Sequence, residues 1–430
     1  MERHLSIITR TNKKKIFKRI NQRGGANFDS KVKLTGHTSG VNSVVFHPTL
    51  PLLATGSNDN TAKLWLLPHS PRCVATLVGH TDSVRSVAFH PTANPPLLAT
   101  GSQDNSVKLW LLSSDNSSAT CVATLEGHRQ CVDSVAFHPT ADPPILATGS
   151  YDETVKLWRL SPDNSSATCV ATLAGHSSSV RSVAFHPTFP FLATGSEDRT
   201  VKLWRLSSDH SSATCVATLV PSGSFVTSVA FHPTADPPLL ATGSWDKTVR
   251  LWNFSPDDPS KASIVATLDG HRASVISLAF HPTLPLLASG SRDNTVRLWL
   301  LSDSQQRATC IATLKGHNLS VWSVAFHPSP TVPLLATGSD DRTVNLWSSQ
   351  SSQKLIGKSS IEKIKPDIII NPTIPEGKDK KSSTAHRKNS FIPLPLTRRT
   401  SRRTSRRHTS RHTSRRSRSN VSYSAIPEEF

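Results

Sequence analysis

The most informative absences in this 430-residue sequence are those of long apolar runs and of clustered cysteines. No run of 18 consecutive apolar residues occurs, so a membrane-spanning helix is not expected. The N-terminal segment also lacks the short apolar core of a secretory leader. The six cysteines include no Cys-x-x-Cys pair of the kind that zinc sites often use. These absences predict an intracellular protein, in the nucleus or cytoplasm, without a bound metal.

Signatures of catalysis are missing as well. The sequence contains no glycine-rich phosphate loop and no nucleophile elbow. Asp133, Glu197 and Asp340 are candidate catalytic acids, but they belong to different copies of the repeat described below, so we do not expect them to meet at one bond. The sequence therefore predicts a protein that is not an enzyme and that uses no cofactor or small-molecule substrate.

Positive charge is concentrated at the two ends of the chain. Residues 1–30 hold eight Lys or Arg and two acidic residues, and residues 348–430 hold nineteen and six. The segment between them, residues 31–347, holds twenty-two of each and is neutral. The formal net charge of +19 therefore describes the tails and their partners rather than the folded part of the protein.

Seven near-identical copies of one pattern fill residues 31–347. The pattern that the copies follow, with small departures, is a Gly-His pair, then Val-x-Ser-Val-Ala-Phe-His-Pro, then Leu-Ala-Thr-Gly-Ser-x-Asp, and then Val-Lys-Leu-Trp. The tryptophans that end the copies are 45 to 48 residues apart, at Trp65, Trp110, Trp158, Trp204, Trp252, Trp299 and Trp347. A fixed period of this length indicates a repeat architecture.

Each copy has the pattern of four short β-strands. In the second copy the strand-like runs are residues 84–89, 97–100, 107–110 and 121–125, which are rich in Val, Leu and aromatic residues and are separated by turn residues. No segment combines helical length with helical period. Because four strands in about 47 residues make one propeller blade, we predict an all-β fold with seven blades.

The pair Gly79-His80, together with Asp104 and Trp110 and their equivalents, resembles the WD-repeat family of β-propellers, and the resemblance covers residues 31–347. In that family a buried network of His, Thr, Asp and Trp stabilises each blade, which implies a structural role here rather than a catalytic or metal-binding one. Each net hydrogen bond of such a network contributes about 0.5–1.5 kcal/mol. The residues so implied are His37, Thr55, Asp59, Trp65, His80, Thr100, Asp104, Trp110, His128, Asp152, Trp158, His176, Asp198, Trp204, Asp246, Trp252, His271, Asp293, Trp299, His317, Asp341 and Trp347.

The repeat frame makes two further predictions. Since each copy begins with the outer strand of one blade, the ring closes only if residues 31–34 complete the last blade beside residues 344–347. The fifth copy departs from the pattern, because Pro221-Ser222 stands where Gly-His is expected, although Thr242, Asp246 and Trp252 are kept. This indicates either a weaker blade or a turn reshaped for binding.

Five of the six cysteines share one position in the fourth strand of a copy, and Cys131 stands alone; the five are Cys73, Cys121, Cys169, Cys215 and Cys310. Equivalent positions on different blades are too far apart for a disulfide, which needs Cα atoms within about 7 Å. We therefore expect all six thiols to be reduced.

Two columns of the repeat vary while their surroundings stay fixed. The residue before the turn Asp reads Asn58, Gln103, Tyr151, Glu197, Trp245, Arg292 and Asp340; the residue after the first Val of the inner strand reads Asn42, Arg85, Asp133, Arg181, Thr227, Ile276 and Trp322. The resemblance implies that both columns surround the mouth of the central channel, on the face that usually holds partners. Both tryptophans that do not end a copy fall in these columns, and Trp, Tyr and Arg dominate binding hot spots. The predicted partner-binding residues are Tyr151, Trp245, Trp322, Arg85, Arg181, Arg292 and Phe225; alternatively, these rings pack on neighbouring loops.

The C-terminal segment cannot form a core. Of residues 398–418 ten are Arg and none is acidic, which predicts disorder and a polyanionic partner. The candidate polyanion-binding residues are Arg398, Arg399, Arg402, Arg403, Arg406, Arg407, Arg415 and Arg416, and the candidate phosphorylation sites, which resemble basophilic kinase sites, are Ser390, Ser401 and Ser405. Phosphates there would offset the Arg charge. Alternatively, the tail is a nuclear signal or a solubilising extension.

We therefore predict four segments: a basic disordered leader (1–30), a seven-bladed propeller (31–347), a linker rich in Ser, Lys and Pro (348–397) and an Arg/Ser-rich disordered tail (398–430). The interpretation we favour is a monomeric, non-catalytic scaffold that binds a protein or peptide at the propeller mouth, with basic tails that tether it to nucleic acid or another polyanion. The alternative is a nucleic-acid-binding or packaging protein in which the Arg/Ser tail is the main functional element.

Overall fold

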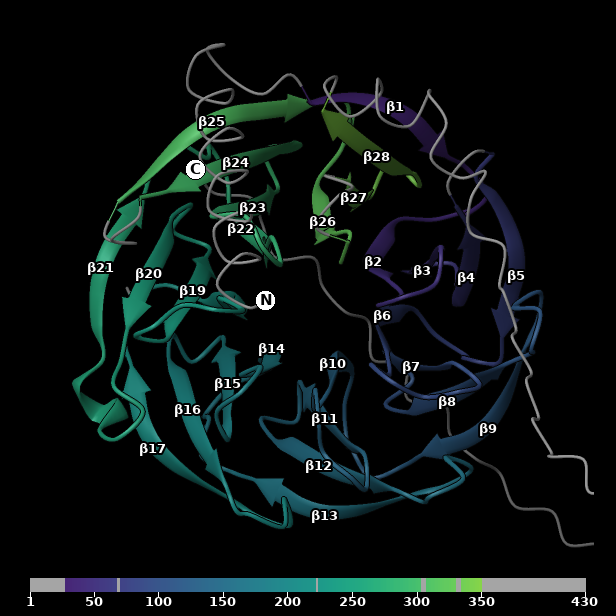
Figure 1. Cartoon of the computed structure of the whole chain (residues 1–430), viewed down its shortest axis with the longest axis horizontal. Coiled ribbons are helices and arrows are strands. Elements are labelled where there is room, and N and C mark those ends of the chain that lie inside the picture. The colour runs from purple at the N-terminus through teal and green to yellow at the C-terminus, as the bar shows by residue number, and fades with distance from the viewer. Residues whose placement is uncertain (1–27, 68–69, 222, 303–306, 330–333, 350–430) are drawn as a thin grey trace, which may run out of the picture. The chain divides into compact units, whose positions relative to one another are not determined.

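The computed structural model describes residues 28–67, 70–221, 223–302, 307–329 and 334–349. They form seven four-stranded antiparallel sheets arranged as blades around a central axis (Figure 1), and the helical content of these residues is one short 3-10 turn, η1 (Pro259–Lys261). The expected all-β propeller with seven blades is confirmed.

The strands of a blade follow the sequence from the axis outward. Blade 1 contains β2 (Val41–Phe46), β3 (Leu52–Ser57), β4 (Thr61–Leu66) and β5 (Arg72–Val78); blade 2 contains β6 (Val84–Phe89), β7 (Leu97–Ser102), β8 (Val107–Leu112) and β9 (Ala119–Leu125); blade 3 contains β10 (Val132–Phe137), β11 (Ile145–Ser150), β12 (Val155–Leu160) and β13 (Ala167–Leu173); blade 4 contains β14 (Val180–Phe185), β15 (Phe191–Ser196), β16 (Val201–Leu206) and β17 (Ala213–Leu219).

The remaining blades repeat this order with one exception. Blade 5 contains β18 (Val226–Phe231), β19 (Leu239–Ser244), β20 (Val249–Asn253) and β21 (Ser263–Leu268); blade 6 contains β22 (Val275–Phe280), β23 (Leu286–Ser291), β24 (Thr295–Leu301) and β25 (Ala308–Lys315); blade 7 contains β26 (Val321–Phe326), β27 (Leu334–Ser339), β28 (Val344–Ser349) and, as its outer strand, β1 (Phe28–Leu34). The exception is therefore blade 7, whose outer strand comes from the start of the propeller.

The N-terminal strand closes the ring in the expected register. Val32 pairs with Leu346 and Leu34 pairs with Val344, so β1 lies antiparallel to β28. Strand β1 begins at Phe28, three residues before the expected start at residue 31. Closure gives the last blade its fourth strand and joins the two ends of the propeller non-covalently.

The second strand of each blade is packed on both faces by neighbouring blades, which explains its glycine. Every residue of β11 is buried, and a Cβ on Gly149 would lie 2.8 Å from Val180 Cγ1 and 2.9 Å from Val183 Cγ1 of blade 4. The equivalent contact across the closure point places Gly338 against Val41 and Val44 of blade 1. The glycine of each second strand therefore sets how closely two blades approach.

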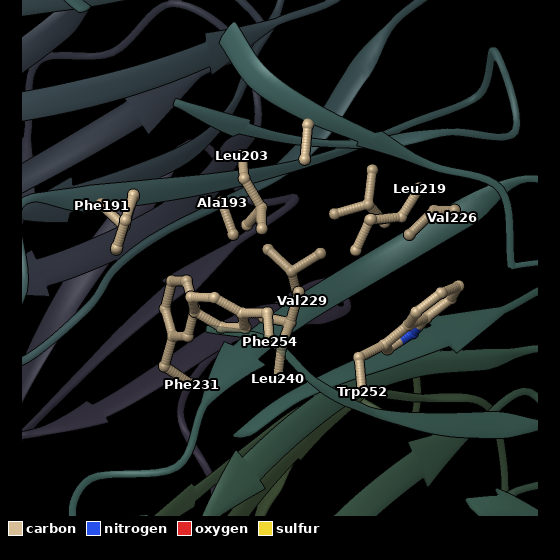
Figure 2. Packing of buried hydrophobic residues seen from close by; sticks show 12 residues of the cluster. Phe191, Ala193, Leu203, Leu219, Val226, Val229, Phe231, Leu240, Trp252 and Phe254 are labelled. Carbon is tan, nitrogen blue, oxygen red and sulfur yellow. The ribbon is translucent and has the colours of Figure 1, made fainter. Parts of the chain in front are cut away.

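The hydrophobic core is divided among the interfaces between blades. One cluster joins Phe191 and Leu203 of blade 4 to Val229 and Leu240 of blade 5, and Figure 2 shows Leu203 and Val229 close to each other within it. Equivalent clusters form between other neighbouring blades. A blade alone would expose half of each cluster, so the apolar burial that stabilises the fold requires the neighbours.

A ring of serine hydrogen bonds also joins the blades near the axis. The Ser134 hydroxyl of blade 3 accepts from the backbone N–H of Val183 in blade 4 at 3.1 Å, and Ser323 of blade 7 accepts from Val44 of blade 1 at 3.0 Å. The same bond occurs at the other five junctions, from Val87 to Ser43, Val135 to Ser86, Val229 to Ser182, Leu278 to Ser228 and Val324 to Ser277. This bond accounts for the repeated Ser of Val-x-Ser-Val, a role that the sequence analysis did not assign.

The histidine of each His-Pro element is a neutral hydrogen-bond acceptor at a blade junction. His186 Nδ1 accepts from the backbone N–H groups of Thr188 and Phe189, at 3.1 and 3.0 Å, and its ring meets Phe231 of the next blade edge-on. Burial lowers the pKa of His186 to about 4. Since Nδ1 accepts, the ring proton is on Nε2, and protonating Nδ1 would break both hydrogen bonds.

We predict that Gly149→Ala destabilises the propeller by about 1–3 kcal/mol, because its new methyl group would overlap the Val180 and Val183 side chains. The matched control is Gly223→Ala, since a Cβ at Gly223 meets no atom within 4 Å. Urea unfolding followed by circular dichroism measures both variants. Equal unfolding midpoints for the two would contradict the inter-blade contact as the reason for the glycine.

We also predict an acid-sensitive stability with its origin at the His-Pro histidines. Because the folded-state pKa of His186 lies below the ordinary value of 6.5, protonation favours the unfolded state, and stability is lost as the pH falls from 6.5 towards 4. His186→Asn keeps an acceptor oxygen and removes the titration. The free energy of unfolding of both proteins should fall between pH 7 and pH 4.5. The fall should be about 1–2 kcal/mol smaller for the variant than for the natural protein. An identical pH dependence would refute this origin.

Candidate functional site

The buried polar network forms in full in six of the seven blades. In blade 2, His80 Nδ1 lies 2.7 Å from an Asp104 oxygen, and His80 Nε2 lies 2.7 Å from Thr100 Oγ1, which also accepts from Trp110 Nε1 at 2.9 Å. With a neutral His80, Trp110 donates to Thr100, Thr100 donates to His80, and His80 donates to Asp104. Equivalent networks contain His37, His128, His176, His271 and His317.

The titration of the network fits this neutral-histidine arrangement. Burial lowers the pKa of His80. Burial opposes the charge of Asp104, but hydrogen bonds from Ser106 and His80 outweigh it and lower the Asp104 pKa to about 2. Blade 6 differs only in using Ser289 where the others use Thr. The network is therefore a structural brace for the turn that precedes each third strand.

Blade 5 replaces the missing histidine with an arginine contact. Trp252 still donates to Thr242 at 3.1 Å, while an Arg250 guanidinium nitrogen lies 2.7 Å from Asp246 Oδ2. The equivalent Arg297 of blade 6, where His271 holds the Asp, instead donates to the Cys310 thiol at 3.4 Å. Arg250 stands at a position that Lys occupies in most repeats. In blade 5, which lacks the Gly-His pair, this residue is the cationic partner of Asp246.

A cavity on the propeller axis is formed by all seven blades. Its lining includes every residue of the inner-strand column and three residues of the turn column: Asn42, Arg85, Asp133, Arg181, Thr227, Ile276 and Trp322, with Tyr151, Trp245 and Arg292. Six of the seven predicted partner-binding residues therefore lie at this channel mouth. The seventh, Phe225, packs against Trp245 with ring centroids 5.0 Å apart.

One side of the mouth, which we term the polar half, consists of Arg85, Asp133, Tyr151, Arg181 and Glu197 from blades 2 to 4. Asp133 lies 3.3 Å from Arg85 and 3.3 Å from Arg181, and Arg181 also pairs with Glu197. The Tyr151 hydroxyl accepts from both arginines, and the Arg181 guanidinium lies 4.3 Å from the Tyr151 ring centroid. These side chains are engaged with one another.

The electrostatics of the polar half follow from its burial and its pairs. Burial opposes the charge of Arg85 and of Arg181, but the Asp133 carboxylate offsets it and raises both pKa values above the ordinary range. Burial raises the pKa of the Tyr151 hydroxyl and raises the pKa of the Cys131 thiol to about 12. The negative charge of Asp133 is the second cause in both cases. Asp133 and Glu197, two of the three candidate catalytic acids, each pair with the Arg181 guanidinium.

The opposite side, which we term the aromatic half, consists of Phe225, Trp245, Ile276, Arg292 and Trp322 from blades 5 to 7. Trp245 is 38% exposed, which is unusual for an indole ring. The Arg292 guanidinium lies over both rings, 5.1 Å from the Trp245 centroid and 5.4 Å from that of Trp322. This half presents apolar surface and a cation together.

The remaining predicted residues are placed as follows. The five repeated cysteines occupy equivalent outer-strand positions, each opposite the Trp that ends its repeat, as Cys121 is opposite Trp110. The predicted polyanion-binding arginines and phosphorylation sites, including Arg398, Ser390 and Ser401, lie outside the described residues.

Within the part of the sequence that the structure describes, no group of three or more His, Cys, Asp or Glu side chains is arranged to hold a metal. No helix among the described residues has the length and apolarity to cross a membrane.

Comparison with known proteins identifies the repeats individually. The family model described as "WD domain, G-beta repeat" matches residues 28–65, 71–110, 119–159, 167–205, 213–253, 262–299 and 308–348. Coatomer subunit alpha of Saccharomyces cerevisiae is 60% identical over 35 residues, which are 8% of this chain and 3% of that protein. Coatomer subunit alpha-1 of Arabidopsis thaliana is 50% identical over 42 residues, 10% of this chain and 4% of that protein. These alignments cover about one repeat and a very small part of each relative.

We predict that Arg250→Ala destabilises the propeller more than Arg297→Ala. Arg250 contacts the turn aspartate of its blade whereas Arg297 does not, and removing a partner from a partly buried carboxylate costs about 1–3 kcal/mol. Thermal unfolding of the two single variants measures the difference, and hydrogen exchange of blade 5 amides localises it. Equal losses, or a larger loss for Arg297→Ala, would show that Arg250 does not substitute for the missing histidine.

Proposed function

Because the chain belongs to the WD-repeat family of β-propellers, we propose that it is a non-catalytic, intracellular scaffold that binds a protein or peptide at the mouth of its central channel. WD-repeat propellers are typically protein-interaction modules, and the fold by itself does not choose the partner. The choice of surface rests on the side chains at the mouth.

The observation that supports this surface most is the aromatic half. Trp245 is exposed beside Phe225, and it lines, with Arg292 and Trp322, a cavity that the fold itself does not fill. Aromatic and arginine side chains in a concave, partly desolvated site supply the largest share of binding energy at protein interfaces, about 2 kcal/mol or more for each hot spot.

The polar half supports the same proposal in a different way. Its two arginines, two carboxylates and tyrosine are fixed by mutual contacts across three blades. Fixed side chains lose little conformational entropy when a partner binds. This half is therefore a rigid wall against which a partner held by the aromatic half would be positioned.

A second candidate function rests on the sequence of the C-terminal tail. Ten arginines within residues 398–418 give a charge density suited to a polyanion such as nucleic acid. In this alternative the tail is the main functional element, and the propeller is a folded cap attached to it. Binding through the tail alone would have a steep dependence on salt concentration.

We predict that Trp245→Ala combined with Trp322→Ala removes the specific partner of the protein. The measurement is affinity capture from lysate at high salt with nuclease, using the full-length protein, the double variant and a control that carries Val78→Ala and Ile264→Ala. The control removes exposed apolar side chains, 74% and 43% accessible, that do not line the mouth.

The control should retain the partner that the double variant loses. Retention by both variants would exclude the mouth as the binding surface. Loss of every partner upon deletion of residues 350–430, with the mouth intact, would instead favour the tail-based function.

A further inference from the structure

Arg292 differs from the other two arginines of the channel mouth in having no acidic partner. Arg85 and Arg181 share the Asp133 carboxylate. Among the residues that the structure describes, no carboxylate forms an ion pair with Arg292 and none of its guanidinium N–H groups makes a hydrogen bond. A guanidinium has five N–H donors, so Arg292 offers a cation whose hydrogen-bonding capacity is left for a ligand.

The two tryptophans hold this cation in place. Trp245 and Trp322 come from blades 5 and 7, on either side of blade 6, and the Arg292 guanidinium lies over both rings. The backbone of Arg292 is fixed as well, because its N–H donates to the Ser274 carbonyl at 3.0 Å. Cation–π contacts restrict the side chain without using its N–H donors. The cost of ordering this arginine upon binding is therefore low.

An independent observation at the same place is the indole N–H of Trp322. Trp322 lines the cavity, yet its buried Nε1 has no hydrogen-bond acceptor among the described residues. A buried N–H without an acceptor costs about 1–3 kcal/mol, which a bound acceptor would recover. The aromatic half thus contains two unmatched kinds of donor, one of them charged.

The carboxylate that lines the cavity is already neutralised, which argues against a basic ligand there. Among the described residues, Asp133 is the single carboxylate that lines the cavity, and it lies between Arg85 and Arg181. Glu197 pairs with Arg181. A lysine or arginine of a partner would approach Arg292 without an unpaired carboxylate among the cavity-lining residues to receive it, and like charges in a partly buried site repel each other.

A nucleic-acid strand fits the mouth less well than a peptide does. Bases would stack on the tryptophans, but a strand bound through its backbone needs several cations along its path. Arg292 is the one arginine of the cavity lining that lacks an acidic partner within the described ranges. A single anionic group beside apolar surface is the chemistry that this half fits best.

We propose that the aromatic half binds an acidic peptide segment, in which one carboxylate bonds to Arg292 and an adjacent apolar side group packs on Trp245 and Phe225. This inference rests on the proposed function of the mouth and specifies its ligand. The carboxylate belongs to an Asp or Glu residue of the peptide or to its free C-terminus. Both sources offer two acceptor oxygens to the guanidinium.

The test is selection of random peptides by the full-length protein, from one library that displays internal segments and one with free C-termini. Peptides selected by the natural protein should be enriched in an acidic residue, or in a terminal carboxylate, next to an apolar residue. Arg292→Glu should reverse the preference and select Lys or Arg, a gain that a misfolded variant cannot produce. Arg272→Gln is the matched control, because Arg272 is an exposed arginine of the same blade outside the cavity.

A selected peptide is then measured by fluorescence anisotropy. Arg292→Gln should weaken binding about tenfold or more, Arg272→Gln should not, and converting the acidic group of the peptide to its amide should reproduce the loss. Selected peptides without an acidic group, or affinity unchanged in Arg292→Gln, would overturn the inference while leaving a peptide-binding mouth. Selection of no peptide by the natural protein would overturn the proposed function itself. Loss of oligonucleotide binding alone in Arg292→Gln would assign the arginine to nucleic acid and overturn the inference.

Discussion

The close approach between the second strand of one blade and the inner strand of the next is the constraint on which the rest of the structure depends. At Gly149 the distance to the Val180 and Val183 side chains leaves no room for a methyl group, and the same approach recurs at Gly338, where the ring closes on Val41. Each apolar cluster is shared by two blades. No blade is a stable unit alone, so stability belongs to the closed ring.

Polar contacts at two places in each junction, near the axis and at the His-Pro turn, also hold neighbouring blades together and fix their relative position. Near the axis, the repeated serines receive backbone N–H groups of the next blade. At the His-Pro turns, each neutral imidazole orders its own turn and places its ring edge-on against a phenylalanine of the next blade. Because both sets close around the ring, a change of register in one blade would break bonds in its neighbours. The polar groups therefore determine which of the apolar packings is adopted.

Much of the fold was predictable from the sequence because the repeats act as internal comparisons. The fixed period and the strand-like runs predicted seven blades, and the phase of the repeat predicted that β1 would complete blade 7. The role of Ser134 and its equivalents was not predictable, because a serine in a β-strand gives no sign of a partner about 50 residues away in the next blade. The compensation by Arg250 was equally hidden, since Lys-to-Arg changes are common in repeats and only geometry shows that Arg250 turns towards Asp246 while Arg297 does not.

The residues of the candidate site were predictable from the repeats, whereas the contacts among those residues required the structure. The two variable columns identified the residues around the cavity, but not that Arg85, Asp133 and Arg181 would pair with one another. Charged residues in separate repeats are about 50 residues apart in the sequence, so their pairing is not evident there. At the propeller axis their side chains are neighbours. Arg292 could not be distinguished from the other arginines by its residue type. Its difference lies in what surrounds it, two indole rings instead of a carboxylate.

The fold leaves the turn column free because the bond that recurs at this position in every blade uses only the backbone. The N–H of the turn-column residue donates to the carbonyl of the residue before the inner strand in every blade, as from Tyr151 to Cys131, from Trp245 to Phe225 and from Arg292 to Ser274. The side group at the position makes no contribution to this bond, so Asn, Tyr, Trp and Arg are all compatible with it. A change of residue in the turn column therefore alters binding chemistry at little cost to the ring. That separation allows one half of the mouth to be an internally paired wall while the other half keeps an unpaired cation between two aromatic rings.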